Sequence, residues 1–157
     1  MPMDRLAKAI AIAAVGHNGQ SSKDSYPYIF HPLTAMFRLR REGESAMIVA
    51  VLHDFFEDCD HDHVDLSFLT PEERYALECL TKKKGENYLE VYLPRVMTSR
   101  LAMLSKEQDL IHNLDGSRMP LRPLTDKDLK RWDKYRVALD RIRTALGRIT
   151  AASTTNA

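Results

Sequence analysis

The segment from Ala46 to Leu52 constrains the fold of this chain most strongly, because every residue in it is apolar. A helix that faces water carries polar residues along one side, so a uniformly apolar helix must be surrounded by other elements. Glu44 or Ser45 can begin this helix, and the charged stretch over residues 58–65 ends it. We therefore predict a central, buried helix that runs on through His53 to that charged stretch.

The rest of the sequence predicts helices that can surround this central one. Apolar residues recur at three- and four-residue steps, and runs of turn-forming residues separate them. No segment shows a persuasive strand ladder apart from a short extended stretch over residues 26–30, so we predict an all-α fold, a compact helical bundle. The other predicted helices span Asp4 to Gly16, Pro32 to about Arg41, Pro71 to about Lys82, Tyr88 to Ser99 with a kink or restart at Pro94, Ser99 to about Leu114, and a last helix that opens at Thr125 to Asp128 and presents an apolar stripe from Leu129 to Leu146.

Length and composition favour one domain. The chain has 157 residues, of which 44% are hydrophobic, and this is enough to build one buried core. We predict a single domain over residues 1–150. Residues 151–157 have too little to bury to offset the entropy lost on ordering, so we predict a disordered C-terminal tail there.

The charge balance and the cysteines indicate the surroundings of the protein. The formal net charge is +1, from 23 basic and 22 acidic residues, so we expect no nucleic-acid partner and no membrane association. The apolar stretch from Leu6 to Val15 is about half the length that a membrane span needs. Cys59 and Cys79 are expected to be reduced thiols, as in a cytoplasmic protein. Nothing in the sequence specifies an oligomeric state.

His53 and Asp54 directly follow the apolar segment and are both able to bind metal. A lone histidine binds metal in only about one case in five, but a carboxylate beside an apolar helix is costly to bury unless a cation compensates its charge. Two ligands do not complete a site. His31, before Pro32, and Asp109, in a later helix, can supply the others. We predict a metal site formed by these four residues, with an open position for water or substrate.

Glu57 and Asp58 lie one helical turn beyond His53 and Asp54. On a continuous helix Glu57 would share the face of His53, because residues four apart are neighbours. The alternative is a solvated helix end, but two acids at a helix C-terminus are disfavoured by the helix dipole. We therefore expect this acid pair to be catalytic.

Five short segments occur in an order that resembles one family of metal-dependent phosphohydrolases. This family is the hydrolase domain of RelA/SpoT-type stringent-response proteins, together with the small alarmone hydrolases. The resemblance covers about residues 5–140 and is closest to short bacterial or phage-borne HD proteins, through Asn113 to Arg118. The five segments are His17–Gln20, Pro27–Leu33, Leu52–Asp58, Leu80–Thr81 and Lys106–Asn113.

The resemblance implies a fold, a reaction and a set of site residues. It implies an HD-domain helical bundle that hydrolyses the alarmone guanosine-3′,5′-bis(diphosphate), or ppGpp, and releases the 3′-pyrophosphate. Mn²⁺ is the usual metal of that family, although imidazole and carboxylate ligands also suit other divalent cations. The matching residues are His31, His53, Asp54 and Asp109 for the metal, Glu57 and Asp58 for catalysis, and Lys23, Lys106 and Asn113 for the substrate, with Arg118 able to complete the nucleotide pocket.

Two alternatives to an alarmone hydrolase stay open. Ser22 stands where the family commonly has an arginine, and changes of this kind alter the choice of substrate. One alternative is therefore an HD-type nucleotidase or a (deoxy)nucleoside triphosphate phosphohydrolase. The other is a non-catalytic module that binds an alarmone or acts like an antitoxin.

Other polar residues are expected to have structural or surface roles. His17 should order the turn at Gly19 and Gln20, and His112 should lie on the wrong face of its helix to contribute. The lysine run over residues 82–84 is usually a solvated loop, with a phosphate-attracting rim as the alternative. The spacing of Trp132 and Tyr135 indicates core packing.

Overall fold

The computed structural model describes residues 4–148, and this part of the chain is helical. The tail predicted over residues 151–157 lies outside the described residues. Among the described residues the β-structure is limited to an isolated antiparallel bridge between Ser21 and Pro27, which confirms the all-α class. The elements are α1 (Arg5–Gly16), α2 (Phe30–Arg38), α3 (Glu44–Val51), α4 (Phe55–Asp58), α5 (Pro71–Leu80), the π-helical turn η1 (Tyr88–Tyr92), α6 (Leu93–Val96), α7 (Arg100–Asn113), the 3-10 turn η2 (Gly116–Arg118) and α8 (Asp126–Ala145).

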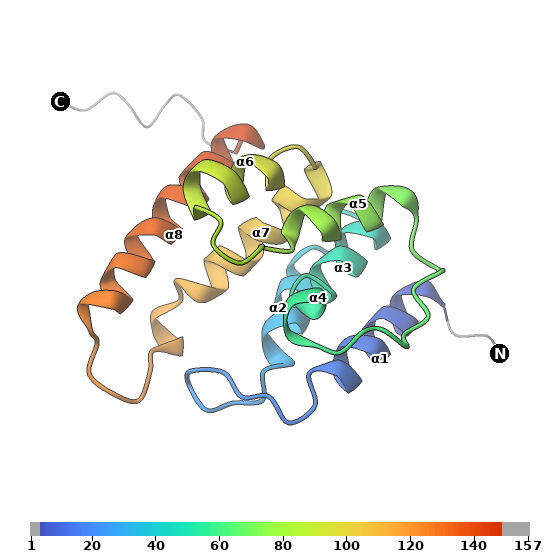
Figure 1. Cartoon of the computed structure of the whole chain (residues 1–157), viewed down its shortest axis with the longest axis horizontal. Coiled ribbons are helices and arrows are strands. Elements are labelled where there is room, and N and C mark those ends of the chain that lie inside the picture. Colours follow the sequence, from blue (N-terminus) through green and yellow to red (C-terminus); the bar gives the residue numbers. More distant parts are fainter. Residues whose placement is uncertain (1–3, 149–157) are drawn as a thin grey trace.

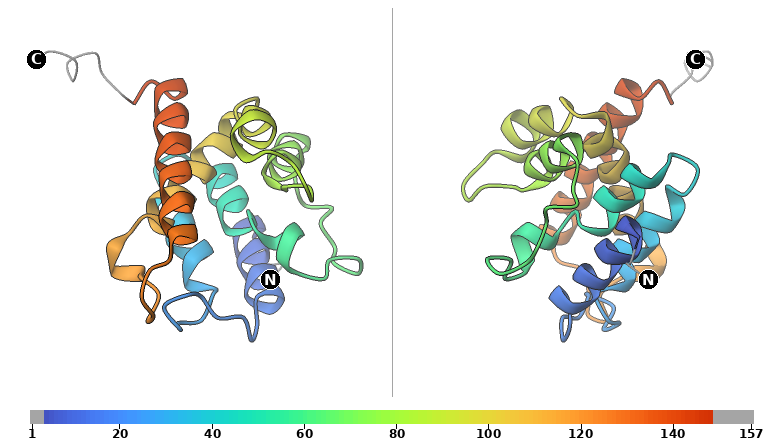
Figure 2. Two further views of the ribbon diagram at one scale, coloured as in Figure 1. Left: turned by 60° about the vertical axis from the view of Figure 1, so that its left-hand side comes forward. Right: turned by 90° about the vertical axis from the view of Figure 1, so that its right-hand side faces the viewer.

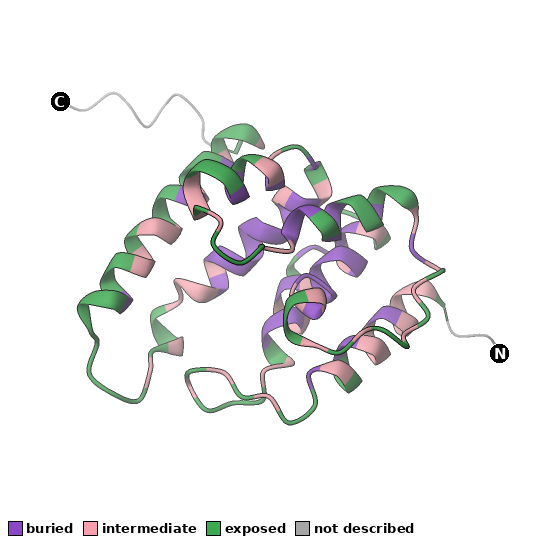
Figure 3. Cartoon of the chain, in the orientation of Figure 1, coloured by how far each residue is buried: buried purple, intermediate pink, exposed green. Residues whose placement is uncertain are grey.

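Helices α3 and α7 form the centre of the molecule (Figure 1). Helix α3 contacts α1, α2, α5 and α7, while α8 packs along α7 on the other side. Figure 2 shows α8 as a long helix at one edge of the bundle. Buried residues concentrate on α3 and α7 (Figure 3), and Ile48, Val49, Ala50 and Val51 are each 0% exposed. The predicted burial of the central helix is confirmed.

Side-chain caps explain where several helices begin. The Asp4 carboxylate accepts a hydrogen bond from the Ala7 amide at the start of α1. Helix α5 opens with a capping box, in which Thr70 and Glu73 each bond the backbone amide of the other. Helix α8 opens in the same way, with Thr125 and Asp128.

The central helix is shorter than predicted. Helix α3 ends at Val51 and α4 begins at Phe55, so His53 lies in a turn between two helices and not on a continuous one. The imidazole Nδ1 of His53 lies 2.7 Å from the Ala50 carbonyl oxygen, which would accept the amide of Asp54 if the helix continued. The side chain thus competes with the backbone for that carbonyl.

The boundaries of the neighbouring elements also differ from prediction. Helix α2 begins at Phe30, two residues before Pro32, and ends at Arg38. The early start is possible because proline is tolerated in the first turn, where backbone amides have no helical partner. The segment before it is a turn and not an extended stretch, since the His31 amide donates to the Tyr28 carbonyl at 2.9 Å. The predicted restart at Pro94 is confirmed, as α6 begins at Leu93.

The described residues also bear on three smaller predictions. No helix within residues 4–148 is long and apolar enough to cross a membrane. Cys59 and Cys79 are free thiols, as expected. Leu129 is 48% exposed, so the predicted apolar stripe of α8 does not include it, whereas Ile142 is fully buried.

Gly16 allows α1 to approach α4 closely. A Cβ atom at Gly16 would lie 2.5 Å from Cε2 of Phe55 and 3.0 Å from Sγ of Cys59. Phe55 is buried and directly follows Asp54, so this contact supports the turn that carries two of the predicted metal ligands.

Gly16→Ala is expected to lower the free energy of unfolding by about 1–3 kcal/mol, because the added methyl group overpacks the Phe55 contact. Alanine gains at most about 1 kcal/mol over glycine in a helix, so the overpacking should dominate. Urea unfolding measures the change. The matched control is Gly116→Ala, since a Cβ at Gly116 has no heavy atom within 4 Å. Equal or greater stability of Gly16→Ala would contradict the prediction.

Candidate functional site

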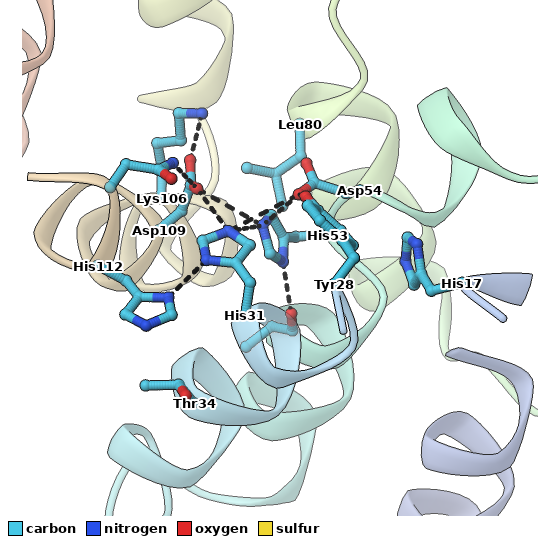
Figure 4. A network of polar contacts seen from close by, with 12 residues as sticks. His17, Tyr28, His31, Thr34, His53, Asp54, Leu80, Lys106, Asp109 and His112 are labelled. Atoms are coloured by element: carbon cyan, nitrogen blue, oxygen red, sulfur yellow. Dashed lines mark hydrogen bonds and ion pairs between the residues drawn. The ribbon is translucent and has the colours of Figure 1, made fainter. Parts of the chain in front are cut away.

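The structure brings the four predicted metal ligands together from three parts of the chain. His31 comes from the first turn of α2, His53 and Asp54 from the turn between α3 and α4, and Asp109 from α7. One donor atom of each lies within 4.8 Å of the other three. Figure 4 shows the four side chains pointing toward one another.

The distances between the donor atoms suit one divalent cation. Nε2 of His53 lies 2.9 Å from Oδ2 of Asp54 and 3.2 Å from Nε2 of His31. Nε2 of His31 lies 3.0 Å from Oδ1 of Asp109. Ligands that bind a metal at about 2.0–2.2 Å lie roughly 3–3.5 Å apart, so only small shifts are needed. Two imidazoles and two carboxylates are compatible with Mn²⁺, Fe²⁺ or Zn²⁺.

The second ring nitrogen of each histidine is held by a partner behind the cluster. Nδ1 of His53 donates to the Ala50 carbonyl, which directs Nε2 toward the carboxylates. Nδ1 of His31 lies 2.6 Å from Nδ1 of His112, and the two ring planes differ by 7°. Burial, together with the nearby His31, lowers the pKa of His112 to about 4. His112 is therefore neutral at physiological pH, and its Nδ1 can accept a hydrogen bond from the Nδ1–H of His31.

The prediction that His112 lies on the wrong face of its helix was wrong. His112 is only 8% exposed and lies three residues after Asp109, so both residues point toward His31. Residues three apart share a helix face, and this spacing is the signal that could have identified it.

Asp109 is held by two neighbours on its own helix. Lys106 Nζ lies 2.6 Å from Oδ2, and Asn113 Nδ2 donates to Oδ1 at 2.6 Å. Burial alone would raise the pKa of Asp109, but Lys106 and His31 outweigh it and hold that pKa well below its usual value. The predicted substrate contacts Lys106 and Asn113 therefore both orient this carboxylate.

Asp54 has a partner that sequence reasoning missed. The hydroxyl of Tyr28 donates a hydrogen bond to Oδ2 of Asp54. Burial raises the pKa of Tyr28, and the Asp54 charge raises it further, so the phenol keeps its proton. Tyr28 comes from the turn before α2, and no local pattern links it to Asp54.

Glu57 and Asp58 face the same space as the metal cluster. A cavity of about 290 Å³ is lined by both acids together with Asp54 and Asp109. Burial is the main cause that raises the pKa of Glu57 and of Asp58, and the Asp54 charge adds to it in both cases. Because the helix breaks at residue 52, Glu57 does not share a continuous helix face with His53, contrary to prediction. Instead, the carboxylate of Glu57 accepts the backbone amide of Lys82.

Two further lysines add positive charge to this cavity. Lys82 and Lys134 line it together with Lys106. Nζ of Lys134 lies 4.7 Å from the ring centroid of Tyr88, and burial, with the Lys82 charge, lowers its pKa. Lys82 therefore lies on the rim of the cavity and not only in a solvated loop.

A second cavity of about 210 Å³ adjoins the first. The two share Tyr28, Asn113 and Tyr135. The predicted substrate residues Lys23 and Arg118 line the second cavity, where Arg118 Nε lies 3.6 Å from Oδ2 of Asp24. Trp132 and Tyr135 line it as well, while Tyr135 also packs against the hydrophobic core, as predicted.

Neither a protein-family model nor a curated protein sequence matches the chain. Among solved structures, it is similar to a metazoan ortholog of SpoT that hydrolyzes ppGpp and plays a role in starvation responses. The TM-score is 0.69 at 22% sequence identity, over 95% of this chain and 99% of that one. The two chains share one fold. The predicted compact helical bundle is thereby confirmed.

His112→Ala is expected to weaken Mn²⁺ binding by about 10- to 100-fold, because His31 loses the partner that orients its ring. Titration calorimetry of the purified protein measures the affinity directly. His63→Ala, in an exposed loop, is the matched control and should leave the affinity unchanged. Equal Mn²⁺ affinity in both variants would show that His112 does not position His31.

Proposed function

We propose that this protein is a divalent-metal-dependent phosphohydrolase that releases the 3′-pyrophosphate of ppGpp. The observation that carries the proposal is the cluster of His31, His53, Asp54 and Asp109, which opens through its carboxylates onto a cavity that also contains Glu57 and Asp58. The shared fold with a ppGpp-hydrolysing protein supports the choice of substrate. Residues 1–150 would form one hydrolase domain, with Mn²⁺ as the metal and the cytoplasm as the place of action.

The reaction adds water to the phosphorus that is joined to the ribose 3′-oxygen. The bond between that phosphorus and the 3′-oxygen breaks, so the products are GDP and pyrophosphate. A divalent cation, when bound, would polarise the phosphate and lower the pKa of water. Glu57, assisted by Asp58, accepts the proton of the attacking water, and its raised pKa brings it closer to neutral pH, which favours a general base.

Positive side chains would receive the phosphates of the substrate. Lys82 and Lys134 lie on the cavity beside the acid pair and can offset charge on the diphosphate group that is transferred to water, while the 3′-oxygen leaves and takes up a proton as the hydroxyl group of GDP. Lys23 and Arg118 lie on the adjoining cavity, where Trp132 and Tyr135 offer aromatic surfaces to a base. This division assigns the reacting phosphates to the first cavity and the nucleoside to the second.

A binding module without hydrolysis is less well supported. Such a module has no need of two acids with raised pKa values beside a metal-competent cluster. The nucleotidase alternative is tested by comparing the hydrolysis of ppGpp with that of other nucleotides.

Purified protein with Mn²⁺ is expected to convert ppGpp to GDP and pyrophosphate, with kcat/KM at least about tenfold above that for dGTP or dAMP, because the site holds separate cationic groups for two phosphate clusters. Chromatography of the nucleotides measures the products. Asp54→Ala is the control and should abolish turnover. Faster hydrolysis of dGTP or dAMP would move the assignment to the nucleotidase alternative.

Glu57→Gln is expected to lower kcat by about 10²- to 10⁴-fold, because the general base is lost. The Mn²⁺ affinity should change little, since Glu57 is not one of the four donors. Burial raises the pKa of Glu57 above 4.5, so the wild-type rate should fall as the pH decreases through that raised value, where the base becomes protonated. A pH profile and calorimetry measure both effects, and Glu72→Gln on exposed α5 surface is the control. Near wild-type kcat in Glu57→Gln would exclude it as the base.

A further inference from the structure

We propose a second ligand site, in which a small aromatic anion of the size of a nucleoside monophosphate binds behind α4 and acts on Glu57. The site is a cavity of about 670 Å³, compared with about 290 Å³ beside the metal cluster. The two cavities share no lining residue. Pockets that hold small ligands usually measure about 300–1,000 Å³, so a mononucleotide fits this volume.

The lining offers aromatic surfaces to a planar ring. Phe56, His61 and Tyr75 all line the cavity. Phe56 and His61 meet edge to face, with ring centroids 5.0 Å apart. Aromatic side chains of this kind bind a flat ligand through stacking or edge contacts.

The charges on the lining favour an anion. The lining includes three basic residues and one acid. The basic residues are Arg74, Lys83 and Arg95, and the acid is Glu78. Arg95 is paired with Glu86, with Nη1–Oε1 and Nη2–Oε2 distances of 2.5 Å and 2.8 Å.

Two cations are available to that anion. Arg95 is neutralised by Glu86, but Arg74 and Lys83 line the cavity with side-chain charges that no acid of the lining other than Glu78 can offset. A phosphate group can accept charge-assisted hydrogen bonds from such side chains.

The cavity contacts the chain neighbour of each partner in the hydrogen bond that holds Glu57. Phe56 lines this cavity while Glu57, the next residue, lines the cavity beside the metal cluster. Thr81 lines this cavity while Lys82, the next residue, lines the other. The Lys82 amide donates to the Glu57 carboxylate. A ligand that displaces Phe56 or Thr81 therefore moves the general base of the proposed reaction.

The test uses GMP as the probe and nuclear magnetic resonance of the isotope-labelled full chain. GMP should shift the amide signals of Tyr75, Cys79 and Thr81 with a common saturation curve. Lys83→Gln should weaken this binding by about tenfold, which corresponds to the loss of one charge-assisted contact. Lys84→Gln is the matched control, because Lys84 is the adjacent lysine and does not line the cavity. Glu78→Gln should tighten binding, because the lining loses its one acid.

Further measurements separate this site from the proposed reaction site. Binding of GMP needs no hydrolysis, so the result does not depend on the proposed activity. Amide shifts at Lys23 and Asn113 report any occupation of the reaction site separately. Guanosine without phosphate, and inorganic phosphate without a base, should each bind at least tenfold more weakly than GMP. On saturation the carboxyl carbon signal of Glu57 should move in the wild type.

Three outcomes would overturn the proposal. They are shifts confined to the reaction site, equal GMP affinities in Lys83→Gln and Lys84→Gln, and a Glu57 carboxyl signal that does not respond when the cavity is saturated.

Discussion

The hydrogen bond from His53 Nδ1 to the Ala50 carbonyl joins the hydrophobic core to the polar site. The last turn of α3, residues 48–51, is fully buried and cannot turn its carbonyls to water, so it needs partners from within the protein. The imidazole supplies one of them and ends the helix. The same bond sets the direction of Nε2, which faces Asp54 and His31. Core packing and ligand orientation thus depend on one contact.

The charges gathered around this contact compensate one another. Ionised carboxylates in a protein interior are costly, and Asp109 is almost fully buried. Lys106, itself under the rings of Tyr88 and Tyr92, stabilises Asp109 from one side, and the two imidazoles stabilise it from the other. This arrangement keeps the donor atoms close together. A divalent cation would take over part of this compensation.

The short helix α4 separates two spaces of different character. One face carries Glu57 toward the acidic and cationic cavity beside the metal cluster, whereas Phe56 faces the larger aromatic cavity. The segment after α5 lines both cavities, because Thr81 lines the larger one and Lys82 lines the one beside the metal cluster. A helix of four residues has few internal hydrogen bonds, so its position depends on what packs against it. This makes α4 the element most open to control by a ligand.

The sequence by itself determined the helical class, the burial of α3 and the starts of α1, α5 and α8, because these follow from residue types at short spacing. It also indicated four side chains of metal-binding chemistry, which the structure brings together. Only the tertiary structure decided the break after Val51, the contact of His112 with His31, and the bond from Tyr28 to Asp54. The last two join residues 81 and 26 positions apart. Such contacts depend on how separate segments pack. The three-residue spacing from Asp109 places His112 on the right helix face but does not name His31 as its partner, and no local pattern links Tyr28 to Asp54.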